Sequence, residues 1–126
     1  MAITYKNPAH MKIYRHYVLL SPYKHTNEFL AAIYLLSADK ELWFQAKKAI
    51  SGKNICFDQI NNKELSCYSY TLYRLAQDFY EGLQHIGLHD IGDSYLISDK
   101  TCALIINAIS ICRDGYNAIG VIKKFN

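Results

Sequence analysis

The chain has 126 residues, of which 51% are apolar and 20% are charged, and its formal net charge is +3 at pH 7. This length suits one domain with its own hydrophobic core, and the apolar fraction excludes a disordered chain. The scattered lysines disfavour a nucleic-acid binder, which would gather several basic side chains on one face. We therefore expect one domain spanning residues 1–126.

The cysteines and the start of the chain bear on where the protein acts. Cys56, Cys67, Cys102 and Cys112 form no CxxC pair, so they are interpreted as buried thiols. The first eight residues contain no apolar leader, and no apolar run approaches the roughly 18 residues that a membrane helix needs. These features predict a cytoplasmic protein without a membrane segment.

Apolar residues recur at three- and four-residue spacing through five segments, which predicts five helices. The first three are expected over about 9–21, 27–37 and 39–51, with Trp43 as the anchor of the third and Gly52 closing it. Residues 53–65 lose this spacing and predict a loop, with one extended piece left open.

The second half of the chain holds the two strongest helical patterns. The fourth helix is expected from Ser66, as its cap, to Gly82. The fifth helix is expected to begin at Ser98 or Asp99 as its cap, and from Cys102 to Cys112 apolar residues occupy most of its circumference, which predicts a helix at the centre of the bundle. The tail 118–125 is left as coil or a short strand. The expected fold is an all-α single compact bundle of about five helices.

One group of side chains resembles the donor set of a metal site. His85 and His89 are four residues apart, and Asp90 and Asp93 follow closely. Gly87 interrupts a helical presentation of the two histidines, and no HExxH or GxSxG motif is present. We predict no catalytic residue, cofactor or metal, and keep these residues as weak candidates for an alternative: a small metal- or phosphate-dependent enzyme.

The chain is rich in tyrosine, with eleven against five phenylalanines and one tryptophan. Tyr73 and Tyr80 are seven residues apart on one flank of the fourth helix, and Tyr70 and Arg74 lie beside them. Tyrosine and arginine are enriched where proteins bind one another. These four residues are the predicted partner-binding residues; packing at the rim of the core is the alternative interpretation of the tyrosines.

Three blocks carry a resemblance to a known family: Leu35 to Trp43, Leu72 to Gly82, and Asn107 to Arg113. From about Thr26 to Tyr116, their order and spacing resemble a family of short, uncharacterised proteins from low-GC Gram-positive bacteria and their phages. The resemblance implies an all-helical domain and an origin in phage or mobile-element genes. It supplies no catalytic residue or ligand.

The sequence as a whole predicts a non-enzymatic protein-binding module with a larger protein partner. By analogy with other small phage proteins, that partner is expected to be a host defence enzyme such as a CRISPR effector. A weak nucleic-acid-binding protein is a further alternative, and a homo-oligomer is left open.

Overall fold

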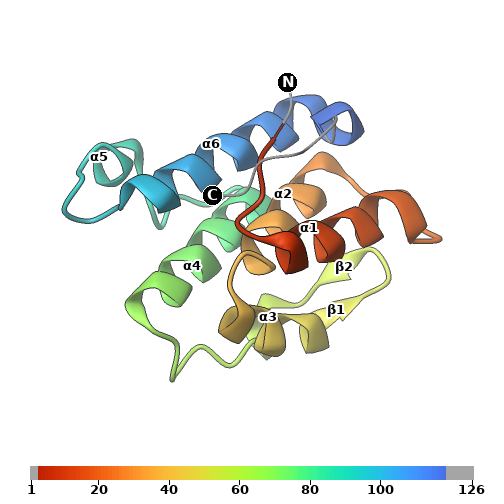
Figure 1. Cartoon of the computed structure of the whole chain (residues 1–126). Coiled ribbons are helices and arrows are strands. Elements are labelled where there is room, and N and C mark those ends of the chain that lie inside the picture. Colours follow the sequence, from red (N-terminus) through yellow and green to blue (C-terminus); the bar gives the residue numbers. More distant parts are fainter. Residues whose placement is uncertain (1–2, 119–126) are drawn as a thin grey trace.

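The computed structural model describes residues 3–118, and this part of the chain is mostly helical, as predicted for an all-α fold (Figure 1). The α-helices and β-strands of the described residues are α1 (Pro8–Arg15), α2 (Asn27–Leu36), α3 (Lys40–Ala46), β1 (Ile50–Ser51), β2 (Asn54–Ile55), α4 (Cys67–Glu81), α5 (Leu88–Ile91) and α6 (Asp99–Asp114). A π-helical turn follows α1 at His16–Leu20, and short 3-10 helices lie at Lys47–Ala49, Phe57–Gln59 and Gly115–Ala118. None of the helices within residues 3–118 is long and apolar enough to cross a membrane.

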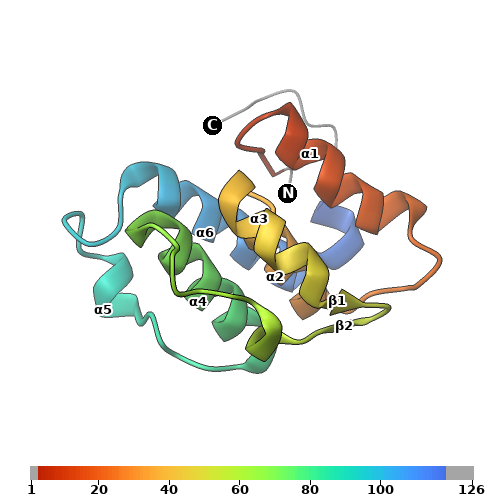
Figure 2. The same cartoon turned by 90° about the horizontal axis from the view of Figure 1, so that it is seen from below.

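Helix α2 is the centre of the bundle. All eight residues from Phe29 to Leu36 are fully buried. The helix packs against α1, α4 and α6, and lies among them in both views (Figures 1 and 2). The prediction that the fifth helix is innermost is therefore wrong. The difference lies in the second face of each helix: Ile106 and Ile109 leave one face of α6 exposed, whereas every residue of α2 from Phe29 to Leu36 is buried.

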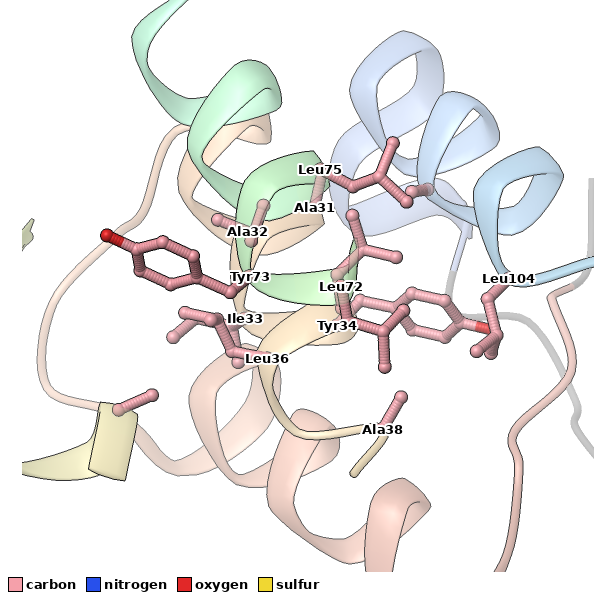
Figure 3. Close-up of a cluster of buried hydrophobic side chains, with 14 of the residues drawn as sticks. Ala31, Ala32, Ile33, Tyr34, Leu36, Ala38, Leu72, Tyr73, Leu75 and Leu104 are labelled. Carbon is pink, nitrogen blue, oxygen red and sulfur yellow. The ribbon is translucent and has the colours of Figure 1, made fainter. Parts of the chain in front are cut away.

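The contact between α2 and α4 forms the middle of the core. Figure 3 shows Leu72, Tyr73 and Leu75 of α4 beside side chains of α2, with Leu104 of α6 closing one side. All four residues are buried. Helix α4 also begins after Ser66 and ends before Gly82, as predicted.

Polar caps fix where the helices begin. One side chain before each of five helices accepts a hydrogen bond from the backbone N–H three residues later, as in standard N-caps. The caps are Asn7, Thr26, Asp39, Ser66 and Ser98. The Asp39 carboxylate also accepts a 2.6 Å hydrogen bond from the Ser69 hydroxyl, which ties the start of α3 to α4.

The segment after α3 differs from the prediction. The helix ends at Ala46, and the chain turns back at Gly52 to form the small antiparallel pair of β1 and β2. Gly52 has a φ of +58°, so it makes a hairpin turn and does not close a helix. Trp43 is only half-buried, while Leu42 and Ala46 are fully buried and anchor α3.

Three other expectations need correction or fall outside the structure. Cys56 and Cys67 are exposed, so the buried-thiol interpretation is wrong for both, and Cys102 and Cys112 are half-buried. The short helix α5 was missed, because four residues are too few to show a helical period. The predicted coil or strand at 118–125 lies, apart from its first residue, outside the described residues.

A buried histidine sits in a cluster of tyrosine rings near α1. His10 Nδ1 accepts the backbone N–H of Lys6 at 3.0 Å, so Nε2 carries the proton and donates to the Tyr34 carbonyl at 2.7 Å. The rings of Tyr5 and Tyr34 lie 5.5 Å and 4.6 Å from the imidazole. Burial lowers the pKa of His10 from 6.5 to about 4, so the ring is neutral at pH 7.

We predict that Leu72→Ala lowers the free energy of unfolding by about 2–5 kcal/mol, because it opens a cavity at the α2–α4 contact. Leu88→Ala is the matched control: Leu88 is 87% exposed, so its truncation costs less than about 0.5 kcal/mol. Urea unfolding of both variants measures the difference. Equal losses would contradict the position assigned to α2.

A second prediction concerns acid stability. The unfolded chain protonates His10 below pH 6.5, whereas the folded chain resists protonation down to about pH 4. Its contribution is therefore complete above pH 6.5 and is lost as pH falls towards 4, by roughly 3 kcal/mol in total. His10→Gln removes this part of the pH dependence.

The measurement is the slope of the unfolding free energy between pH 7 and pH 4.5, compared with exposed His89→Gln as control. Burial also lowers the pKa of His25, which adds a slope of the same sign to every variant. A slope unchanged by His10→Gln would refute the neutral, buried assignment.

Candidate protein-binding surface

A shallow apolar groove lies where α4, α5 and α6 meet. We call it the α4–α6 groove. Its lining residues are Leu75, Asp78, Phe79, Leu83, Ile86, Leu88, Ile91, Ile105 and Ile109. Its volume is about 200 Å³, below the roughly 300–1,000 Å³ of typical small-molecule sites. A hollow of this size suits an anchoring side chain better than a cofactor.

Large apolar side chains project around this groove. Leu88 is 87% exposed, Ile106 53%, and Leu83 and Ile109 43% each. Ile106 and Ile109 belong to α6, whose opposite side, with Leu104 and Ala108, is buried against α2. An apolar cluster left open on three adjacent elements is typical of a contact surface.

A hydrogen-bonded set of side chains borders the groove on the α4 side. We call Tyr70, Arg74, Asp78 and His85 the Arg74 cluster. Arg74 Nε donates to the Tyr70 hydroxyl at 2.8 Å, and its guanidinium stands over the Tyr70 ring, 5.2 Å from the centroid. A terminal nitrogen of Arg74 also lies 3.4 Å from His85 Nε2. The guanidinium is thereby held flat against the helix surface.

Asp78 links the Arg74 cluster to the segment that follows α4. Its Oδ1 accepts a 2.7 Å hydrogen bond from His85 Nδ1, and its Oδ2 accepts the backbone N–H of Ile86 at 2.8 Å. Because Nδ1 donates, the neutral imidazole presents the lone pair of Nε2 towards Arg74. Asp78 therefore fastens the segment that follows Gly82 along α4 and positions α5 beside the groove.

The predicted partner-binding residues fall into two groups. Tyr70 and Arg74 belong to the Arg74 cluster, and Tyr70 is exposed. Tyr73 is only 5% exposed and packs against Phe57, with 6.1 Å between ring centroids. The Tyr80 hydroxyl accepts the backbone N–H of Ile55. The rim-packing alternative thus describes Tyr73 and Tyr80, whose rings hold the hairpin and the following turn against α4.

The weak metal candidates have other partners here. His85 is paired with Asp78, Asp90 accepts the backbone N–H of Gly87, and Asp93 accepts that of Tyr95. His89 is exposed on α5. Across residues 3–118, no group of three or more His, Cys, Asp or Glu side chains is placed to hold a metal ion.

Sequence reasoning missed the apolar residues that define the groove. Leu88 follows a glycine in a short polar segment, where it carries no periodic signal. Ile106 and Ile109 did carry a signal, the nearly continuous apolar circumference of α6. This pattern predicted complete burial of the helix. A helix with one buried face and one open contact face has the same pattern.

A second exposed aromatic surface lies on α3. Phe44 is 54% exposed, and the Lys48 and Lys47 ammonium groups stand 4.3 Å and 5.5 Å from its ring centroid. The adjoining hollow, about 670 Å³, is lined only by residues 39–47. A surface along one short helix encloses no ligand, so it is the weaker candidate.

In comparisons with known proteins, no family model, curated protein or solved structure matches this chain.

We predict that Asp78→Asn loosens the segment after α4. The substitution weakens the charge-assisted bonds to His85 and to the Ile86 N–H, so amide exchange at residues 82–91 should accelerate about tenfold, equivalent to roughly 1.4 kcal/mol. Hydrogen exchange read by mass spectrometry measures this. Glu81→Gln, an exposed neighbour on α4, is the control and should leave exchange unchanged. Faster exchange throughout the chain would instead indicate global destabilisation.

Proposed function

We propose that this protein is a non-enzymatic protein-binding module that acts in the cytoplasm by docking a larger protein on the α4–α6 groove. The observation that carries the proposal is the open apolar surface formed by Leu83, Leu88 and Ile109, which line the groove and are at least 43% exposed. Leu88 is almost unburied, so it exposes apolar surface to water and adds little to the stability of the fold.

The arrangement of the surface supports protein recognition. Interfaces commonly combine a central apolar area with a polar rim in which tyrosine and arginine are enriched. Here the apolar groove supplies the centre, and Tyr70 and Arg74 supply one rim. Because Arg74 is already hydrogen-bonded to Tyr70 and Gln77, binding a partner costs this rim little side-chain entropy.

The resemblance to short proteins of low-GC Gram-positive bacteria and their phages guides the choice of partner. A small protein of such genomes that docks on a larger one would be able to block it. We therefore propose a host defence enzyme, such as a CRISPR effector, as the first partner to test. This step is an analogy and rests on no contact in the structure.

The test is affinity capture from low-GC Gram-positive lysates with tagged wild-type protein, Leu88→Gln and Leu20→Gln. Leu20 is also a strongly exposed leucine, but it follows α1, far from the groove in sequence. We expect one protein to be captured in stoichiometric amounts by the wild type and Leu20→Gln, with at least about tenfold less on Leu88→Gln. Capture that ignores Leu88, or no stoichiometric capture, would overturn the proposal.

A further inference from the structure

The chain segment that supplies most of the α4–α6 groove is acidic, and one of its carboxylates, Asp78, lines the groove. Residues 75–99 contain five carboxylates, Asp78, Glu81, Asp90, Asp93 and Asp99, and neither lysine nor arginine, in a chain whose overall formal charge is +3. Arg74 and Lys100 stand at the two ends of this segment. The segment includes the end of α4, all of α5 and the start of α6, which are the elements around the groove.

From this acidic segment we propose that the groove receives a basic amphipathic helix from the partner protein; this inference rests on the proposed function. Its apolar stripe would lie over Leu88 and Ile109, and lysines or arginines beside that stripe would face the carboxylates. A helix fits because the groove runs between helices. The only sheet in the described residues is a hairpin whose two strands have two residues each, and it does not line the groove.

The individual carboxylates support different parts of this proposal. Asp78, Asp90 and Asp93 accept backbone hydrogen bonds from Ile86, Gly87 and Tyr95, so they shape the segment as well as charge it.

Glu81 and Asp99 are exposed and accept no side-chain hydrogen bond within residues 3–118. They add negative charge without fastening a loop. Within a Debye length of about 8 Å, such charges attract a basic partner and repel an acidic one.

The experiment uses synthetic helices as probes. One is a fluorescein-labelled amphipathic helix of leucine and lysine, roughly five turns or ~18 residues long. A second replaces every lysine with glutamate, and a third scrambles the leucine–lysine order so that no apolar stripe remains. Fluorescence anisotropy measures binding of each probe to the purified full chain at low and at physiological salt.

We expect the leucine–lysine helix to bind at least about tenfold more tightly than either other probe, and to weaken severalfold at the higher salt concentration. Leu88→Gln should weaken binding about tenfold, and Leu20→Gln should not. Glu81→Gln with Asp99→Asn should weaken it about threefold or more. The matched control, Glu41→Gln with Glu64→Gln, neutralises two exposed carboxylates outside the segment and should have no effect.

Each contrary result points to a specific error. If the lysine and glutamate helices bind equally well and binding still depends on Leu88, the groove is a docking site but does not prefer a basic helix. Binding that ignores Leu88 overturns the groove itself. Sedimentation velocity tests whether the groove binds a second copy of this chain through its Phe44 surface. Self-association that is lost in both Leu88→Gln and Lys48→Glu would identify that second copy as the occupant. It would overturn the proposal of a separate basic partner.

Discussion

Burial of α2 on every side is the constraint on which the rest of the structure depends. A helix with no solvent face must consist almost wholly of apolar residues, and the run from Phe29 to Leu36 meets that condition. Three helices pack against it: α4 through one apolar stripe, α6 through one face, and α1 through His10 and Tyr14, whose rings lie against Tyr34 of α2. The faces of α4 and α6 that do not contact α2 are not needed for this core.

The sequence predicted the elements better than their roles. Capping residues and apolar spacing located α2, α4 and α6 because both signals are local to the chain. Which helix is central depends instead on how the other helices pack around it, and the spacing of residues within one helix does not record that. The apolar circumference of α6 was read correctly as a pattern, yet half of it is open to solvent at Ile106 and Ile109.

The candidate surface was predictable only in part, for a related reason. Tyr70 and Arg74 were predicted because their residue types are common in interfaces, and they lie beside the groove. Tyr73 is of the same type, but its position on α4 turns it towards Phe57, so residue type alone could not separate a rim from a core. The hydrogen bonds of Asp78 to His85 and Ile86 join residues on either side of a chain reversal, and no helical period records such contacts.

The groove is a consequence of how the chain returns from α4 to α6. Residues 82–98 fold back along α4, held by Asp78, and place the four-residue α5 at the edge of the α4–α6 contact. So small an element cannot cover both neighbours, and it adds the exposed Leu88 and the carboxylates of the same segment. The length and acidity of one connection thus produce both the open apolar surface and the charge around it.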